Sequence, residues 1–368
     1  MTQAEQQYFA IMRAALWDTP VALEGTPEWE GIMRIASHHA TNVLVADVAS
    51  RLEGELAPSS NLLREMRVSM RSNLMQHLEL KRILTMAVNA LREKDIEPIL
   101  LKGFGLALLY PNPHLRQFGD IDLYIGQKQF HKACYVLRAL PGSYNWGDEV
   151  DTGRHYNIEF GQHPMEIHRV SVDIDDPKAA ALYETIEQDG LADHRQTVDF
   201  EGFPLSVPSK EFVVFFTFFH VWEHFMTTGV GWRQLSDVAM TLHRYHNDLD
   251  TSKLRSWIMA MHMMESWQAF GWLMVNRLGL PEEEFPFYEP NCQKRALKLY
   301  DRVMAEGNFC RPNRFKHSKP KGRFAKKIHS FIGIFIDYHH LSAVFPSQAK
   351  HEMIITLKTG FAKNFQKK

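Results

Sequence analysis

The chain has 368 residues, 45% of them hydrophobic and 23% charged, which indicates a globular protein of two or three structural units. Its formal net charge of -1 excludes a global field that would draw it to nucleic acid or to acidic lipid. Cys134, Cys292 and Cys310 lie far apart without zinc or redox spacing, so we expect a reducing, cytoplasmic setting.

The first part of the chain has the spacing of helices. Apolar side chains such as Ile32, Ile35 and Ala36 recur three and four positions apart. This pattern predicts an N-terminal helical region over residues 1–95. The polar start of the chain lacks the charged and then apolar order of a signal peptide, so we expect no export.

A change of period marks a second region, which we expect to be a mixed-sheet core over residues 96–207. Short segments that are mostly apolar, or that alternate between polar and apolar residues, have the pattern of strands. The last two of these predicted strands, over residues 154–160 and 165–170, are separated by a turn-like stretch that begins at Gly161, which predicts a hairpin. The predicted strands are Ile96–Leu101, Asp120–Ile125, Arg154–Phe160 and Met165–Val170.

The remainder of the chain, residues 208–368, is predicted to be a helical domain, with Ser209 as the N-cap of its first helix. The apolar run Phe212–Phe219 is far shorter than the ~20 residues that span a bilayer, so it predicts a buried core helix and no membrane partner. The three regions together predict an α+β fold in which a central mixed sheet is flanked by N-terminal and C-terminal helical regions.

Two aspartates in the predicted strand 120–125 indicate a metal site. Alternate side chains of a strand share a face, so Asp120 and Asp122 project together, about 7 Å apart at the backbone. Two such carboxylates repel each other, and a hard divalent cation that prefers oxygen ligands reverses the sign of that interaction. We therefore expect Asp120 and Asp122 to bind Mg²⁺ or Mn²⁺.

The segment before this strand has features of a phosphate site. Gly103 and Gly105 follow a predicted strand, and a backbone without Cβ lets amide N–H groups approach phosphate oxygens. Lys102 and Arg116 could neutralise phosphate charge, Arg116 by a bidentate fork. Either could equally be a solvated surface charge or the structural partner of an acid.

A third acidic ligand is expected at Glu166, which stands in an apolar-acid-apolar strand. With the hairpin turn centred on Gln162 and His163, its direct cross-strand partner is Glu159. Like charges opposite each other destabilise a sheet, which favours a cation at Glu166. His168 could orient Glu166, contact the nucleotide, or be structural.

These residues resemble the motifs of the nucleotidyltransferase superfamily of DNA polymerase beta type. A closer resemblance is to an uncharacterised bacterial nucleotidyltransferase family, through a Leu-Lys-Gly segment, a Tyr-Pro-x-Pro turn followed by Arg, Asp-Ile-Asp-Leu and Glu-x-His. Residues 232–237 also resemble the family's helical region, so the similarity covers about residues 4–245. The matching residues are Lys102, Gly103, Tyr110, Pro111, Pro113, Arg116, Asp120, Asp122, Glu166 and His168.

The resemblance implies metal-dependent transfer of a nucleoside monophosphate from a nucleoside triphosphate such as ATP, with release of pyrophosphate. The acceptor is a small molecule, a protein or an RNA that the sequence does not identify. Asp120 and Asp122 would ligate both metal ions, and Glu166 would ligate one and help to deprotonate the acceptor. The residues expected to contact the nucleotide are Lys102, Gly103, Arg116, His168 and His220.

Two other functions compete with this interpretation. His220, Glu223 and His224 fit the H-x-x-E-H pattern of a zinc-dependent hydrolase, although the same histidines could simply edge the cleft beside the nucleotide. A non-catalytic nucleotide-binding module is the other alternative. The basic residues of 311–327 could bind a nucleic-acid backbone, but we favour a solvated linker there.

Overall fold

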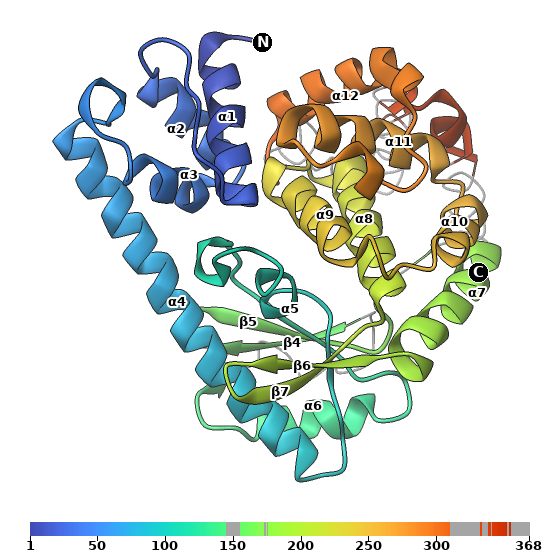
Figure 1. Ribbon diagram of the computed structural model, residues 1–368. Helices are drawn as coiled ribbons and strands as arrows, with labels where there is room; N and C mark the ends of the chain where they lie inside the picture. The colour runs from blue at the N-terminus through green and yellow to red at the C-terminus, as the bar shows by residue number, and fades with distance from the viewer. Residues whose placement is uncertain are drawn as a thin grey trace.

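The structure is a computed structural model, and its described part confirms the predicted α+β fold: helices at both ends of the chain surround one mixed sheet (Figure 1). The N-terminal helices begin where caps are available. Thr2 and Glu5 form a capping box at α1, and the Ser59 hydroxyl accepts from the backbone of Leu62 at the start of α4. The residues that the structure describes are 1–144, 155–172, 174, 176–309, 332, 338, 339, 341–351, 353 and 354.

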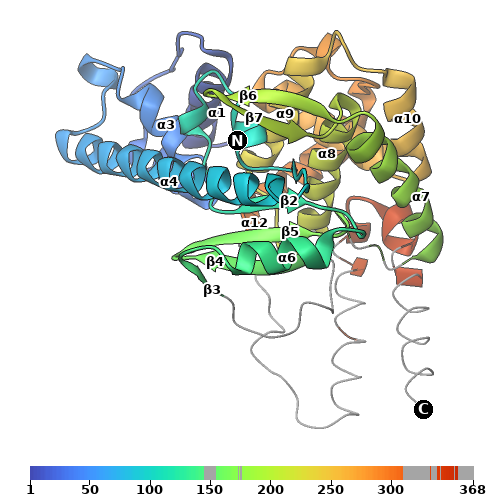
Figure 2. The ribbon, with the colours of Figure 1, turned by 90° about the horizontal axis from the view of Figure 1, so that it is seen from below.

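The N-terminal helical region divides into two parts. Three short helices pack together, and the 33-residue α4 then runs from them along the side of the sheet (Figures 1 and 2). The bounds are α1 Gln3–Trp17, α2 Trp29–His38, α3 Asn42–Ala49 and α4 Ser60–Arg92.

In the described residues, seven strands form one sheet in the order β3-β4-β5-β2-β1-β7-β6. The sheet is mixed because β2 pairs with β5 in parallel and with β1 in antiparallel orientation, while β1 and β7 are parallel. The bounds are β1 Ile99–Leu100, β2 Ile121–Tyr124, β3 Ser143–Tyr144, β4 His155–Phe160, β5 His163–His168, β6 Gln196–Phe200 and β7 Phe203–Val207.

The register of the β4–β5 hairpin differs from the sequence prediction. Gly161, with φ of 64°, and Gln162 form the turn, so the hairpin closes one residue earlier than expected. Glu166 therefore faces Asn157, and Glu159 faces Pro164. The predicted opposition of Glu159 and Glu166 was wrong because Gly161 readily adopts the positive φ that this turn requires.

The two faces of the central strands have different chemistry. Ile121, Leu123, Met165 and Ile167 belong to a core that also contains α4 and α6 (Phe130–Arg138). The alternate positions of β2 and β5 include Asp122, Glu166 and His168. Helix α6 lies on the side of the sheet away from α8 and α9 (Figure 1). The polar positions therefore face the C-terminal helices.

The C-terminal helices begin as predicted. The Ser209 hydroxyl accepts from the backbone N–H of Phe212, which confirms the predicted N-cap, and all of Phe212–Phe219 is buried. No described helix combines the length and the apolar composition that crossing a bilayer requires. The bounds are α7 Pro177–Glu187, α8 Lys210–Thr227, α9 Trp232–Tyr245, α10 Thr251–Ala260, α11 Met264–Leu273 and α12 Gln293–Glu306, with the one-turn α5 at Phe104–Ala107.

One large core joins the two ends of the chain. Helices α1–α3 share it with α8–α12, and the ring of Phe9 packs edge-on against Trp232 with centroids 4.7 Å apart. The Trp17 indole donates to the carbonyl of Leu278 at 2.6 Å. The three-part division of the chain made from the sequence remains a prediction, and the core contains residues from both of its helical parts.

Candidate active site

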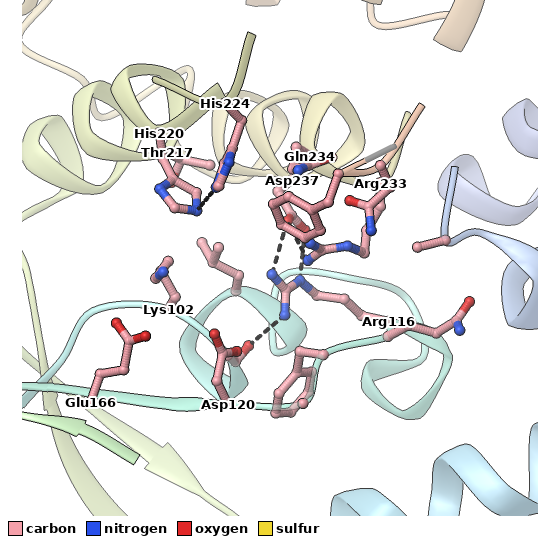
Figure 3. A pocket seen from close by; sticks show the side chains of 18 of the residues that line it. Lys102, Arg116, Asp120, Glu166, Thr217, His220, His224, Arg233, Gln234 and Asp237 are labelled. Carbon is pink, nitrogen blue, oxygen red and sulfur yellow. Dashed lines mark hydrogen bonds and ion pairs between the residues drawn. The ribbon is translucent and has the colours of Figure 1, made fainter. Parts of the chain in front are cut away.

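A cavity of about 730 Å³ lies between the polar face of the sheet and the helices α8 and α9. Its floor comes from the segment after β1, the segment before β2, and β5. Its roof comes from α8 and the first turns of α9 (Figure 3). The residues that line the cavity include Lys102, Gly103, Arg116, Asp120, Glu166, His220, Arg233, Gln234 and Asp237.

Two of the three predicted acidic residues lie on the floor of this cavity, and the third lies beneath it. Asp122 on β2 is directly opposite Glu166 on β5 in the parallel register, and Asp120 immediately precedes β2. Asp120 and Glu166 line the cavity, whereas Asp122 is fully buried beneath it. The structure thus places Asp120, Asp122 and Glu166 near one another, and their role as metal ligands stays a prediction.

Lys102 is the cation that faces these acids. Its Nζ lies 3.2 Å from Asp122 Oδ1, and the side chain is largely buried. Burial lowers the pKa of Lys102, but the charges of Asp122, Asp120 and Glu166 outweigh it and raise the pKa above its usual value. Lys102 therefore stays protonated and provides one positive charge among three carboxylates.

His168 links two of the acids from below. Its Nε2 donates to Asp122 Oδ1 at 3.1 Å and lies 3.4 Å from Glu166 Oε2. Burial disfavours the charged imidazole, but the hydrogen bonds to Asp122 and then Glu166 raise its pKa overall. His168 thus holds both carboxylates in position at the bottom of the site.

The pKa values of the three acids diverge. Burial, reinforced by Asp122, raises the pKa of Asp120 despite the opposing effect of Lys102. For Asp122, burial is overcome by Lys102 and by the His168 hydrogen bond, which hold its pKa well below the usual range. For Glu166, burial is likewise overcome, chiefly by the hydrogen bond from His168. Asp120 is therefore the acid that most lacks a counter-charge.

The carboxylate chemistry of this site suits a hard divalent cation, but within the described residues Asp120, Asp122 and Glu166 do not form a group whose ligand atoms all lie within 4.8 Å of one another. Asp122 Oδ2 is buried without a hydrogen-bond partner, which is costly for a carboxylate unless another ligand approaches it. Carboxylate oxygens of Asp120 and Glu166 lie at the same site, and such oxygens are the ligands that Mg²⁺ and Mn²⁺ prefer. A cation here would supply the positive charge that Asp120 lacks.

Arg116 has a different position from the one expected of a phosphate ligand. Its Nε and Nη2 donate to the two carboxylate oxygens of Asp237 on α9 at 2.6 and 2.8 Å, and its Nη1 donates to the carbonyl of Gly103 at 3.1 Å. The Tyr110 hydroxyl donates to the same aspartate at 2.7 Å. Of the alternatives left open by the sequence, the structural partner of an acid is therefore the one observed.

Arg233, in the first turn of α9, lines the cavity but was not predicted as a site residue. Its nearest acid is Asp237, at 3.9 Å, too far for a strong hydrogen bond. The sequence did contain a signal: a cation in the first turn of a helix opposes the helix dipole and is favoured there only when an anion is near. Within the described residues, Arg233 is thus a largely buried cation whose ion-pair partner, Asp237, lies 3.9 Å away.

A family model described as "Uncharacterised nucleotidyltransferase" matches residues 25–279. The chain belongs to this family. The matched range contains all the cavity-lining residues named for this site, so the cavity lies within the part of the chain that the family model covers. No curated protein and no solved structure matches the chain. The wider DNA polymerase beta-type superfamily and a bacterial source remain expectations from the sequence.

The two histidines of the H-x-x-E-H pattern, His220 and His224, contact each other. The Nε2 atoms of His220 and His224 lie 2.8 Å apart, and His224 Nδ1 bonds the Thr228 hydroxyl at 2.9 Å. Neither histidine belongs to a three-ligand group in the described residues, so the geometry brings no third ligand to the zinc-hydrolase alternative. The three-ligand groups found there are His155–Glu166–His168 and His243–His246–Glu284.

Gly103 shapes the cavity through its backbone. It has φ of 66° and ψ of -113°, a conformation that side chains with a Cβ rarely adopt, and it caps the one-turn helix α5. Its carbonyl thereby points at Arg116. The basic segment 311–327, considered above for nucleic acid, lies outside the described residues.

Proposed function

We propose that this protein transfers a nucleoside monophosphate from a nucleoside triphosphate to an acceptor hydroxyl or amine and releases pyrophosphate. The observation that carries the proposal is the parallel pairing of Asp122 with Glu166 beside Asp120, on the floor of a cavity large enough for a nucleotide. Membership of a nucleotidyltransferase family supports the reaction type.

Asp120, Asp122 and Glu166 would hold Mg²⁺ or Mn²⁺. Bound there, the cation supplies charge neutralisation for the triphosphate and for the leaving pyrophosphate. Lys102 partly neutralises the negative charge of the three acids, and its ion pair holds the Asp122 side chain in position. His168 fixes the orientations of Asp122 and Glu166 from beneath, so the carboxylates are in place before the substrate arrives.

Glu166 is the residue best placed to take a proton from the acceptor. Its low pKa keeps it ionised near neutral pH, and it lies in the cavity wall rather than beneath it. His220 lies across the cavity, on α8, and its electrostatic effect on Asp122 lowers the pKa of that carboxyl. We propose a cytoplasmic reaction, since Cys134 and Cys292 are free thiols.

The Asp120→Asn variant tests this function. The Asp120 side chain has no hydrogen-bond partner in the described part of the chain, and two other carboxylates lie nearby, so removal of its charge should leave folding stability unchanged or improve it. Metal binding should nevertheless weaken, and pyrophosphate release should fall at least ~100-fold, because a charge-stabilising ligand is lost. Asp301→Asn, an exposed position on α12, is the matched control.

The assay incubates the wild-type protein with each of the four labelled ribonucleoside triphosphates, Mg²⁺ or Mn²⁺, and a cell extract as the source of acceptors. Transfer of label from the α-phosphate to a small molecule, protein or RNA, together with loss of transfer in Asp120→Asn, supports the proposal. If the wild-type protein binds no triphosphate with either metal, the proposed function is wrong. Binding without pyrophosphate release would favour the non-catalytic nucleotide-binding alternative.

A further inference from the structure

The cavity has walls of opposite charge. The floor carries the carboxylates of Asp120 and Glu166, with Asp122 beneath them and one ammonium, that of Lys102, among them. The roof at the first turn of α9 carries Arg233 beside the Arg116–Asp237 ion pair (Figure 3). An excess of negative charge on one side therefore faces an excess of positive charge on the other.

The positive charge of the roof belongs to Arg233. Asp237 already accepts three hydrogen bonds, two from Arg116 and one from Tyr110, and its charge is matched by the Arg116 guanidinium. The remaining guanidinium, Arg233, lies 3.9 Å from this carboxylate. Burial lowers the pKa of Arg233, and the neighbouring Arg116 lowers it further, against the opposing effect of Asp237.

A second group in the same turn also lacks a partner. Gln234 is buried and lines the cavity, and its Oε1 accepts from the backbone N–H of Gly231 at 2.7 Å. Its Nε2 amide is buried without a hydrogen-bond partner. A buried donor of this kind is costly unless an acceptor is supplied from outside. Arg233 and Gln234 thus offer donors, and the helix dipole adds a preference for an anion.

We propose that Arg233 and Gln234 form the subsite for the terminal phosphates of the nucleoside triphosphate. This inference rests on the proposed function and assigns the orientation of the substrate within it. A triphosphate carrying a divalent cation has its own charge separation, with the cation at one side and the anionic oxygens at the other. It matches the cavity when the cation lies at Asp120, Asp122 and Glu166 and the phosphate oxygens lie towards α9.

The subsite also explains the role of Arg116. By occupying both oxygens of Asp237, Arg116 prevents that carboxylate from neutralising Arg233 in the same helix. Arg116 is then a positioning residue, which acts on the phosphates through Asp237 and Arg233 rather than by direct contact. The guanidinium predicted from the sequence to bind phosphate is replaced in that role by one from the C-terminal helices.

The test uses magnesium tripolyphosphate, a probe that has no base and needs no acceptor, and measures its affinity by calorimetry. Arg233→Gln should weaken binding about 10- to 100-fold, because a charge-assisted fork to phosphate is lost. Arg233→Lys keeps the charge without the fork and should give an intermediate loss. Arg244→Gln, an exposed arginine on the same helix, is the matched control and should bind as the wild type does.

The possible results distinguish failure of the phosphate subsite from failure of the proposed nucleotidyl transfer. Wild-type binding that is retained within twofold in Arg233→Gln overturns the subsite but leaves the proposed function standing. Absence of wild-type binding to tripolyphosphate and to every nucleoside triphosphate overturns both. Should Arg233→Gln fail to fold by circular dichroism, Arg233→Lys decides, since unchanged affinity in that variant also contradicts a fork to phosphate.

Discussion

Replacing Asp237 with Asn isolates the buried ion pair that ties α9 to the segment before β2. Asp237 accepts from Arg116 Nε at 2.6 Å, from Arg116 Nη2 at 2.8 Å and from the Tyr110 hydroxyl at 2.7 Å. Asparagine keeps one acceptor oxygen and turns an NH₂ group towards the guanidinium. Arg116, only 3% exposed, is left as an uncompensated buried charge. We expect the free energy of unfolding to fall by about 3–5 kcal/mol.

Urea denaturation followed by tryptophan fluorescence measures this loss. Glu79→Gln is the control, because Glu79 and Arg82 form the same two-bond geometry, at 2.8 and 3.0 Å, but on the solvent side of α4. That variant should change stability little. The double variant Arg116→Met/Asp237→Leu should recover much of the loss, since no unpaired buried charge remains.

A loss of stability in Asp237→Asn no larger than that in Glu79→Gln would contradict the expected cost of an unpaired buried charge. That expectation is also contradicted if the double variant costs as much as the two single changes, Arg116→Met and Asp237→Leu, added together. Either result would mean that burial does not distinguish the two ion pairs.

Two further predictions concern stability. Burial lowers the pKa of His39 from 6.5 to about 3, so the unfolded chain binds a proton first as the pH falls, and stability is lost between pH 6.5 and about 3. The free energy of unfolding of His39→Leu, relative to that of the wild type, should therefore rise by about 2 kcal/mol between pH 7 and pH 5 in urea titrations. An equal pH dependence of stability in the two proteins would contradict this. Gly103→Ala should cost about 1–3 kcal/mol in thermal unfolding because of its positive φ. Gly105→Ala should not, because Gly105 has no such φ and an added Cβ would lie at van der Waals distance, 3.8 Å, from its nearest neighbour.

The meeting of the acids could be predicted because it depends on local pattern. Alternation places Asp122 and Glu166 on strands with apolar neighbours on the opposite face, and the structure pairs them directly. The hairpin register was wrong although its signal was present: of the four residues between the expected strands, Gly161 most readily takes a positive φ. The position of the β4–β5 turn is therefore determined by the conformational freedom of the Gly161 backbone rather than by the charges of Glu159 and Glu166.

The partners of the arginines could not be predicted in this way. Arg116 and Asp237 are 121 residues apart in sequence, and only the packing of α9 over the sheet brings them together. The same packing leaves Arg233 3.9 Å from Asp237, whose two carboxylate oxygens already accept from Arg116. Which arginine is neutralised and which remains available to a ligand is thus a property of tertiary contacts.

The core shared by the two ends of the chain has a consequence for synthesis. Tyr300 on α12 donates to Glu5 on α1 across 295 residues of sequence, and Arg13 donates to the carbonyl of Arg277. At about 5–20 residues per second, α1 leaves the ribosome roughly 15–60 s before the helix that completes its packing. During that interval the apolar side of α1 has no partner from α12, so nascent chains should be open to capture by chaperones until translation has passed α12.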